Sequence, residues 1–585
     1  MRKLLRFLKP FWFGIILIML LLLGQAMAEL FLPTLMARIV NDGLMTPAQL
    51  GEDPRMYLII ETGIFMLFIA LLAGAASICA GYLSPKIAAG AAKALRRELF
   101  TKAENFSQAE FDKFSSASLI TRCTNDISQV QQLANITARM LLYAPIMAIG
   151  GITMALTRSV SMSWIIALAV IVLLGLVTTI VSIVMPKFKI IQEMMDRLNK
   201  VSREILHGLL VIRAFCTQNH EKQKFDKTNT ELRDMGLFVG RVMSVAGPLI
   251  TFMISGTQVL IIWVGAHQVA NSTLPVGDMM AFMQYAMQVI FAFMMISMVL
   301  VMVPRAQVSA ARIIEVLDTE ISITDPENPV DFSIDNKGIV TLENVSFRYP
   351  AAEANAVERI SFTALPGQTT AIIGATGSGK STIAQLILRL YDITDGSITV
   401  NGTDIRHVTQ AALRDRIGYV PQKGQLLSGT IDSNIRYGKP EATDDEIEKA
   451  ATIAQAFDFI FEKEEKYESE ISQGGSNVSG GQRQRLSIAR ALAKKPEILI
   501  FDDSFSALDF QTDTKLRKAL KEHTGDATVI VVAQRVGTIM NAEQIIVLED
   551  GKIVGKGTHD QLLKSCPAYN EIATSQGMLE VENNG

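Results

Sequence analysis

The residues of this chain whose spacing points most clearly to chemistry form a glycine-rich stretch that ends in a lysine and a serine. The stretch reads Gly374-Ala375-Thr376-Gly377-Ser378-Gly379-Lys380-Ser381, followed by Thr382. In the pattern G-x-x-x-x-G-K-[ST], glycines let backbone N–H groups approach phosphates, the lysine reaches the β- and γ-phosphates, and the hydroxyl is a ligand for Mg²⁺. Thr369 to Ile373 has the pattern of a buried strand and Thr382 to Leu390 that of a helix. This stretch therefore predicts a site for a nucleotide and Mg²⁺, although the pattern alone fits many NTPases.

A second candidate element is an apolar strand that ends in two carboxylates. It reads Ile498-Leu499-Ile500-Phe501-Asp502-Asp503. The first carboxylate at the end of such a strand can hold the Mg²⁺ shell of a bound nucleotide, so Asp502 joins Ser381 as a predicted metal ligand.

A third element places a serine and two glycines at the expected start of a helix. It reads Val478-Ser479-Gly480-Gly481-Gln482, and Arg483, Gln484 and Arg485 follow. Helix N-termini attract phosphate through their free N–H groups and the helix dipole. The element therefore predicts a second nucleotide-binding surface, distinct from the glycine-rich loop.

Together these elements resemble an ATP-binding-cassette (ABC) exporter half-transporter, and the resemblance covers nearly the whole chain. Ser-Gly-Gly-Gln at 479–482 is the signature that separates this family from other P-loop proteins. The resemblance implies an ATP hydrolase coupled to transmembrane transport. It also assigns adenine stacking to Tyr349, the Q-loop and a metal contact to Gln422, and the D-loop to Ser506-Ala507-Leu508-Asp509. The family's coupling segments fall at Phe111 to Asp126 and around Arg213-Ala214-Phe215.

Two catalytic positions depart from the family pattern. Asp503 stands where the family has the glutamate that acts as general base, and Gln534 stands where it has a switch histidine. Aspartate is one methylene shorter, and a misplacement of about 1 Å at a reacting centre can slow a reaction on the order of 10²-fold. Glutamine cannot ionise. We therefore expect the chain's own P-loop to bind ATP and hydrolyse it slowly, with natural variation that retains function as the alternative.

The family pairs two such domains head to tail, so that each site joins the P-loop of one chain to the signature of the other. The signature here would then complete a partner's site. This chain resembles the degenerate-site subunit of bacterial heterodimeric multidrug exporters, which implies a second half-transporter subunit as its partner.

Hydrophobic residues make up 49% of the 585 residues against 19% charged, and the apolar excess lies before about Pro304. A membrane-crossing helix needs about 20 apolar residues. Six segments are predicted to span: Phe11 to Ala37, Met56 to Pro85, Met140 to Leu156, Trp164 to Met185, Val242 to Val264 and Met279 to Val303. The basic start of the chain before Ala26-Met27-Ala28 is similar to a signal peptide, but the apolar run continues to Leu35, which favours a full span.

The segments after the second and fourth spans are rich in Lys and Arg, whereas the opposite loops hold only Arg38, Arg55 and Arg158. Because positive charge stays on the cytoplasmic side, we expect a multi-pass cell-membrane protein with both termini in the cytoplasm. The two basic segments are predicted to be helices that continue past the membrane.

The predicted fold is thus a polytopic α-helical membrane domain of six spans with long cytosolic helical extensions, fused to an α/β P-loop ABC nucleotide-binding domain. The expected domains are 1–310 (transmembrane), 311–336 (linker) and 337–585 (nucleotide-binding). A net charge of -3 leaves no basic field for nucleic acid, which is excluded as a partner.

Glu29 and Glu61 lie within apolar spans, where carboxylates are costly enough to suggest function; the alternative is that both face water near the outer ends of their spans. The sixth span is rich in methionine, which suits varied apolar ligands but also ordinary helix packing. The favoured function is therefore export of amphiphilic, drug-like or lipid-like compounds by alternating access, with membrane lipid and small amphiphiles as partners. A regulatory membrane ATPase and a lipid or peptide exporter remain open.

Overall fold

The computed structural model describes residues 2–45, 54–333, 336–350 and 352–576. It divides into two compact units. The first consists of Met1–Glu104 and Ala117–Thr319, and the second of Asn105–Ser116 and Glu320–Gly585. The second unit therefore includes a short segment from the membrane half of the sequence.

Six helices of the first unit are long and apolar enough to cross a membrane. They are α1 (Trp12–Arg38), α2 (Pro54–Glu104), α5 (Ile127–Arg158), α6 (Ser163–His207), α8 (Gln218–Ala270) and α9 (Val276–Asp318). They correspond to the six predicted spans, which confirms them, and only Phe11 of the first predicted span lies outside its helix, at the end of the preceding segment. The 53 residues of α8 extend roughly 80 Å at 1.5 Å per residue, against about 30 Å of hydrocarbon. The predicted continuation of helices past the membrane is also confirmed.

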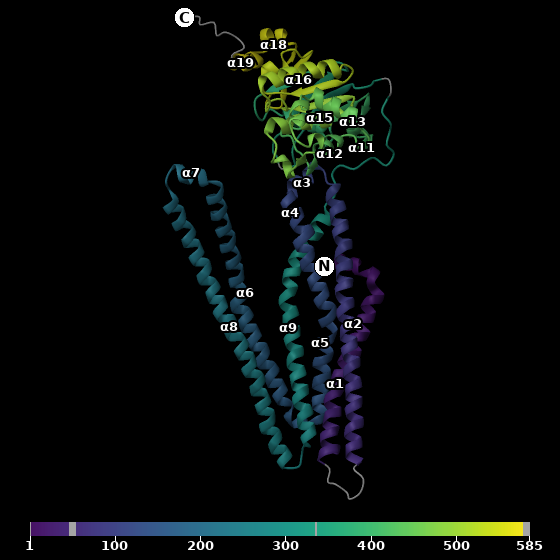
Figure 1. The fold of residues 1–585 in the computed structure, drawn as a ribbon, viewed down its shortest axis with the longest axis vertical. Coiled ribbons are helices and arrows are strands. Elements are labelled where there is room, and N and C mark those ends of the chain that lie inside the picture. The colour runs from purple at the N-terminus through teal and green to yellow at the C-terminus, as the bar shows by residue number, and fades with distance from the viewer. Residues whose placement is uncertain (1, 46–53, 334–335, 351, 577–585) are drawn as a thin grey trace. The chain divides into compact units, whose positions relative to one another are not determined.

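Close helix packing within this unit depends on small residues. Helices α1, α2, α5 and α9 pack against one another, while α6 and α8 run side by side and are joined by α7 (Leu209–Ala214) (Figure 1). A Cβ atom added to Gly150 would lie 2.3 Å from Leu30 Cδ1, and one on Gly151 would lie 2.8 Å from Val289 Cγ2. A side chain at either position would require Leu30 or Val289 to shift, so these glycines help α5 to approach α1 and α9 closely.

Short helical segments connect these helices or begin the chain. They are η1 (Arg2–Phe11), η2 (Ile39–Leu44), α4 (Ser116–Thr121), η3 (Arg122–Asp126) and η4 (Val160–Met162).

The second unit is an α/β domain built on a six-stranded sheet of order β12-β11-β3-β10-β9-β6. Strands β11, β3, β10, β9 and β6 are parallel, and β12 is antiparallel to β11. Their bounds are β3 (Thr369–Gly374), β6 (Ile417–Val420), β9 (Ile498–Asp502), β10 (Thr528–Val532), β11 (Gln544–Glu549) and β12 (Lys552–Gly557). A parallel sheet covered on both faces explains why β9 is a run of buried residues.

Two smaller sheets and a set of helices complete this domain. The four-stranded sheet has the order β2-β1-β4-β5, with β1 (Val340–Phe347), β2 (Val357–Ala364), β4 (Asp395–Val400) and β5 (Thr403–Asp404). β7 (Gly429–Thr430) pairs with β8 (Glu470–Ile471). The helices are α10 (Lys380–Ile387), α11 (Gln410–Asp415), α12 (Ile431–Arg436), α13 (Asp444–Ile453), α14 (Phe457–Phe461), η5 (Lys466–Glu468), η6 (Gln473–Gly475), α15 (Gly480–Ala493), α16 (Phe510–His523), α17 (Val536–Ile539), α18 (His559–Ser565) and α19 (Pro567–Ser575).

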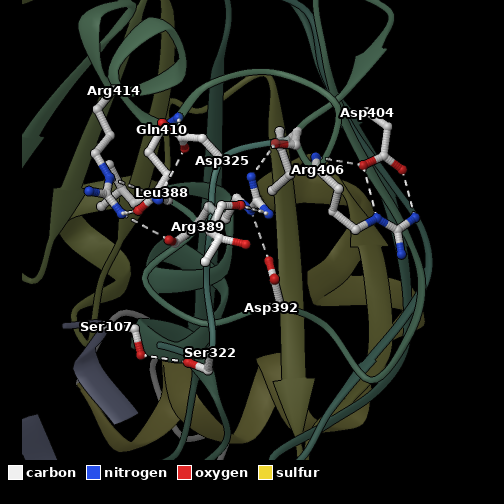
Figure 2. A network of polar contacts seen from close by, with 12 residues as sticks. Ser107, Ser322, Asp325, Leu388, Arg389, Asp392, Asp404, Arg406, Gln410 and Arg414 are labelled. Carbon is white, nitrogen blue, oxygen red and sulfur yellow. Dashed lines mark hydrogen bonds and ion pairs between the residues drawn. The ribbon is translucent and has the colours of Figure 1, made fainter. Parts of the chain in front are cut away.

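The segment that leads into this domain is held on its surface by polar contacts (Figure 2). Asp325 accepts hydrogen bonds from the backbone N–H of Gln410, at 2.9 Å, and from its side-chain amide. The buried guanidinium of Arg389 donates to the carbonyl of Thr324 and pairs with Asp392 at 2.9 Å. The segment around Thr324 and Asp325 is thus part of the folded domain.

Helix α3 (Gln108–Phe114), from the first predicted coupling segment, packs in the same unit. Tyr391 donates a hydrogen bond to Asp112 at 2.6 Å, and the hydroxyls of Ser107 and Ser322 are 2.9 Å apart (Figure 2 shows this pair). Burial and the Asp112 carboxylate raise the pKa of the Tyr391 hydroxyl, so it remains a donor across the physiological range. α3 is therefore fixed on the nucleotide-binding domain through a neutral phenol.

Candidate nucleotide-binding and catalytic site

The glycine-rich loop links β3 to α10, as the sequence predicted, and it needs glycine at two positions. A Cβ atom on Gly374 would lie 2.1 Å from the carbonyl oxygen of Leu548 in β11. Gly379 has φ +93°, and a Cβ there would lie 2.6 Å from the carbonyl oxygen of Ala356. Between them, Ala375, Thr376 and Gly377 are exposed. The loop can therefore present its backbone to a ligand while both of its ends are packed tightly.

Lys380 is held inside the loop by the backbone. Its Nζ donates to the carbonyl oxygens of Gly374 and Ala375 at 2.8 and 2.7 Å, and the residue is 7% exposed. Burial lowers the pKa of its ammonium group, while the neighbouring carboxylates of Asp502 and Asp503 oppose that change. The ammonium is thus positioned at the centre of the loop, partly desolvated, where an anion would stabilise it further.

One atom of the loop indicates what the loop accommodates. The Ser378 hydroxyl oxygen is buried and has no hydrogen-bond partner among the described residues. A buried hydroxyl without a partner is energetically costly, and a phosphate oxygen would satisfy it. Together with the tightly packed glycines and the enclosed lysine, Ser378 makes the loop fit the phosphates of ATP.

A pair of side chains suited to Mg²⁺ lies where α10 meets the end of β9. Ser381 Oγ donates to Asp502 Oδ1 at 2.7 Å, and Tyr419 donates to the other carboxylate oxygen at 3.4 Å. Asp502 is 4% exposed, and this burial raises the pKa of its carboxyl against the opposing effect of the two hydrogen bonds. A hydroxyl and a carboxylate side by side are oxygen ligands of the kind that Mg²⁺ prefers, with phosphate and water completing its shell.

The adjacent residue, Asp503, is held by two amides. Gln534 Nε2 donates to Asp503 Oδ2 at 2.9 Å, and Gln422 Nε2 donates to the same oxygen at 3.1 Å. Asp503 has φ +48°, a left-handed conformation that is uncommon outside glycine, and its N–H donates to the carbonyl of Val532 at 2.9 Å. The structure thus brings together the two positions that depart from the family pattern.

The electrostatics of Asp503 follow from its partial burial. Burial raises the pKa of this carboxyl, while the Gln422 hydrogen bond and the charges of Lys380 and Arg535 act in the opposite direction. Its carboxylate oxygen already accepts from two amides, so it is less available to accept a proton from water. Gln422 contacts Asp503 rather than Asp502, and a direct part in metal binding would require it to turn.

Tyr349 lies beside the helix that follows the loop. Its hydroxyl is 3.0 Å from Thr382 Oγ1, and its ring packs edge-on against those of Phe347 and Tyr391 at centroid distances of 4.9 and 5.3 Å. This aromatic group lies within the nucleotide-binding domain next to α10, as adenine stacking would require. Through Tyr391, it is one ring away from the contact with α3.

The signature forms the N-terminus of α15. Ser479 is its N-cap residue: its side chain accepts from the N–H of Gln482 at 3.2 Å, and Gln482 Oε1 accepts from the N–H of Ser479 at 3.1 Å. Ser479 and Gly480 are exposed. A Cβ on Gly481 would lie 3.4 Å from the carbonyl oxygen of Ala507, so the signature and the D-loop are neighbours. The described hydrogen bonds of the Ser479 side chain lie within its own helix, and its exposed face is accessible to a ligand.

Asp509, from the predicted D-loop, caps the next helix. Its carboxylate accepts from the N–H of Thr512 at 2.9 Å at the start of α16. These backbone and side-chain hydrogen bonds from Thr512 lower the pKa of the Asp509 carboxyl. The residue is therefore a fixed negative charge beside the signature.

No sequence motif assigns a role to Gln484, which links the Q-loop to the signature helix. Its buried amide accepts from the N–H of Gly424 at 2.8 Å and donates to the carbonyl of Pro421 at 3.1 Å. A Cβ on Gly424 would lie 2.8 Å from Ser487 Oγ, so the loop lies directly on α15. A glutamine on the inner side of an amphipathic helix was the available sequence signal.

Gln576 was missed as well, and it contacts the switch segment. Its side chain accepts from the N–H of Val536 and donates to the carbonyl of Gln534, both at 2.8 Å. No spacing in the sequence relates these positions, because they meet only when α19 packs beside β11.

Comparisons with known proteins agree with this architecture. The family models for the ABC transporter transmembrane region and for the ABC transporter match residues 15–293 and 357–506. An uncharacterized ABC transporter ATP-binding protein of Mycobacterium tuberculosis is 40% identical over 574 residues, which are 97% of each chain. A probable multidrug resistance ABC transporter ATP-binding/permease protein of Bacillus subtilis is 30% identical over 597 residues, or 100% of this chain and 99% of that one.

A more distant relative, the ATP-dependent lipid A-core flippase of Salmonella typhimurium, is 29% identical over 572 residues, or 97% of this chain and 96% of the flippase. The solved structure of a bacterial Atm1-family ABC exporter with ATP bound matches with a TM-score of 0.78 and 24% identity, over 98% of this chain and 99% of that one. This likeness shows the exporter fold.

The fold and the site thus define a membrane ATPase with one helical and one nucleotide-binding domain. The chain belongs to the ABC transporter family, and its ATP-binding domain is an ATPase coupled to transport. It is a multi-pass membrane protein, and the described residues contain six helices that could span the membrane.

Proposed function

We propose that this chain is one half of a heterodimeric exporter, whose own P-loop site binds ATP and hydrolyses it slowly. The observation that carries the proposal is the bond between Asp503 and Gln534 at 2.9 Å, in a chain whose signature retains its full Ser-Gly-Gly-Gln sequence. The slow site belongs to this chain's P-loop, whereas the signature serves the P-loop of another chain. The two features therefore act in two different composite sites.

The residues that would hold the nucleotide are those of the loop and its neighbours. Lys380 and the loop N–H groups would bind the phosphates, Ser381 and Asp502 would bind Mg²⁺, and Tyr349 would stack on adenine. Bound Mg²⁺ supplies charge neutralisation at the phosphates. Asp503 is then the group left to orient water, with a side chain about 1 Å shorter than glutamate and two amides on one oxygen.

An exposed apolar tip favours a partner subunit. Around α7, Leu206, Leu210 and Phe215 have exposed fractions of 74, 83 and 75%. Soluble surfaces seldom gather such side chains, and an apolar patch rimmed by polar residues is typical of a protein interface. This segment is the second predicted coupling segment, and the nucleotide-binding domain of the partner is its proposed contact.

The proposed orientation follows from charge. The basic segments that include α7 and α3 would lie in the cytoplasm with both termini and the nucleotide-binding domain.

The proposed cargo is amphiphilic, drug-like or lipid-like. Relatives described as a probable multidrug transporter and a lipid A-core flippase support this class, since both cargo classes include molecules with apolar and polar parts. The proposed mechanism is alternating access, in which ATP binds the two states of the pump with different affinity.

The test compares the chain alone with the chain co-purified with a half-transporter that carries the family's catalytic glutamate and switch histidine. We expect much higher ATPase activity from the pair, together with ATP-dependent movement of a fluorescent phospholipid analogue in sealed proteoliposomes. High activity of the chain alone that Asp503→Asn abolishes would overturn the slow-site proposal. ATPase activity of the pair without any flux would favour a regulatory ATPase instead.

A further inference from the structure

A cluster of polar side chains lies among the membrane-spanning helices of the first unit. It consists of Gln25 and Glu29 from α1, Tyr143 from α5 and Gln288 from α9. One oxygen of the half-buried Glu29 carboxylate accepts from Gln25 Nε2 at 2.9 Å, and the other accepts from the Tyr143 hydroxyl. Gln288 Nε2 donates to the backbone carbonyl of Glu29 at 3.1 Å. Residues of three helices thus meet around Glu29, two of them at its carboxylate and one at its backbone carbonyl.

The carboxylate lies deep in its span. About nine residues separate Glu29 from the end of α1 at Arg38, or roughly 13 Å of helix, which is close to half of the ~30 Å hydrocarbon thickness. The contact with Tyr143 of α5 favours a place between the helices over the alternative that Glu29 faces water near the outer end of its span. Glu61, in α2, is exposed and provides a contrast.

Helix packing alone does not account for a carboxylate here. A hydrogen bond between membrane helices contributes about 0.6 kcal/mol on average, whereas an aspartate at the centre of a span costs about 3 kcal/mol to insert. A neutral glutamine at position 29 could contact the same two partners, with its oxygen accepting from Gln25 and its amide N–H donating to the Tyr143 hydroxyl. The negative charge therefore calls for a reason other than joining α1 to α5.

No positively charged side chain among the described residues pairs with the carboxylate of this cluster. Among the described residues, the Glu29 carboxylate accepts hydrogen bonds only from neutral groups and takes part in no ion pair. Gln288 Oε1 is buried without a hydrogen-bond partner. A carboxylate and an amide oxygen, both acceptors, are thus available next to the same turn of α1. A ligand that supplies a cation would satisfy both groups.

The surroundings are apolar and aromatic. Tyr143 and Leu30 belong to a hydrophobic cluster that also contains Met147, Phe282 and Met283. Methionine side chains adapt to varied apolar shapes, and aromatic faces attract cations. The part of a ligand bound next to the charged group would therefore be hydrophobic.

We propose that the Glu29 cluster binds the cationic group of an amphiphilic cargo, so that the transporter prefers lipophilic organic cations. This inference rests on the proposed export function and narrows its cargo class. The carboxylate acts as the counter-charge, Gln288 supplies a further acceptor, and the methionines and aromatic rings hold the hydrophobic part.

The test uses two ions of equal shape and opposite charge, tetraphenylphosphonium and tetraphenylborate. Equilibrium dialysis against the full chain with its partner in nanodiscs gives a Kd for each ion. We expect Glu29→Gln to weaken tetraphenylphosphonium binding at least about tenfold, as expected for the loss of a charge-assisted contact, and to leave tetraphenylborate binding unweakened. Glu61→Gln, the matched control, should change neither Kd by more than about twofold.

Glu29→Asp keeps the charge and guards against a folding artefact. It should retain more of the preference for the phosphonium than Glu29→Gln does. Two results would overturn the proposal. One is that Glu29→Gln and Glu29→Asp both weaken the binding of the two ions equally, and the other is that Glu29→Gln leaves phosphonium binding unchanged. Flux of the phospholipid analogue by the unmodified pair distinguishes a failure of this inference from a failure of the proposed export function. Flux without a cation preference refutes only this inference, and no flux of any amphiphile refutes the export function.

Discussion

The P-loop edge and the signature edge of the nucleotide-binding domain differ in how complete they are. At the P-loop edge, Lys380, Asp502 and Asp503 are buried and bonded to groups of the same chain. At the signature edge, Ser479 and Gly480 are exposed, and the described hydrogen bonds of the serine side chain only cap its own helix. The difference indicates that the first edge is built within one chain, whereas the second is available to another chain.

The two edges also differ in their sequence relative to the family. The exposed edge keeps the full signature, and the buried edge carries both substitutions, Asp503 and Gln534. Since these two residues hydrogen-bond to each other, they form one altered unit. The comparison therefore predicts that changes at the two edges will affect different composite sites of a dimer.

The largest effect is expected at the signature edge. Ser479→Ala should lower the ATPase activity of the complex on the order of 10²-fold, because in the proposed heterodimer it removes a hydroxyl that would donate to a phosphate in the partner's site. Asp503→Asn should cost far less, since it belongs to the slow site. Steady-state turnover of the two variants checks this, with the exposed Ser476→Ala as control. Intact turnover in Ser479→Ala combined with abolished turnover in Asp503→Asn would reverse the assignment.

A double substitution sharpens the comparison by repairing the buried edge. Asp503→Glu with Gln534→His should raise the ATPase activity of the chain alone by about 10²-fold, because the longer carboxylate restores the reach of the base. Each single substitution should give less, since the two side chains contact each other. The activity of the purified chain measures the gain. A double variant no faster than the unmodified chain would mean that these residues do not limit its hydrolysis.

Lys380→Ala tests nucleotide binding at the buried edge. The loss of one charge-assisted hydrogen bond corresponds to about 1.5–3 kcal/mol, so ATP affinity at this site should fall about 10- to 100-fold. Labelling with an ATP photoprobe measures it, and the chain should remain in the membrane. Lys552→Ala, an exposed lysine of the same domain, is the control. Unchanged labelling of the P-loop in Lys380→Ala would refute the assigned site.

The smallest effect is on stability. Burial raises the pKa of Asp503, so between the ordinary aspartate pKa and this raised value the folded protein binds more protons than the unfolded chain. The free energy of unfolding therefore falls as the pH rises through this window, and the penalty is fully present above it. Asp503→Asn should raise the Tm of the nucleotide-free domain by about 1–2 °C at pH 8 and less at pH 4.

Thermal unfolding of the full chain at the two pH values tests this expectation. Asp526→Asn serves as the control, since the Asp526 side chain is exposed to solvent. A stabilisation by Asp503→Asn that is larger at pH 4 than at pH 8 would contradict the sign of the pKa shift.

Local patterns determined much of this protein. The six spans follow from runs of apolar residues longer than the hydrocarbon thickness, and the P-loop follows from glycines and a lysine within eight positions. Boundaries were less well determined. The predicted helix from Thr382 to Leu390 runs from Lys380 to Ile387, because Gly379 and Arg389 adopt positive φ on either side.

Only the tertiary structure decided the contacts between residues far apart in the sequence. Three hydrogen bonds join segments that lie far apart in the sequence. They run from Gln534 to Asp503, from the N–H of Gly424 in the Q-loop to Gln484, and from Tyr143 to Glu29. A sequence specifies residue types and periodicity, but the partner of a buried amide or carboxylate depends on which elements pack together. For this reason, the sequence identified Asp503 and Glu29 as unusual, and the fold identified the groups that surround them.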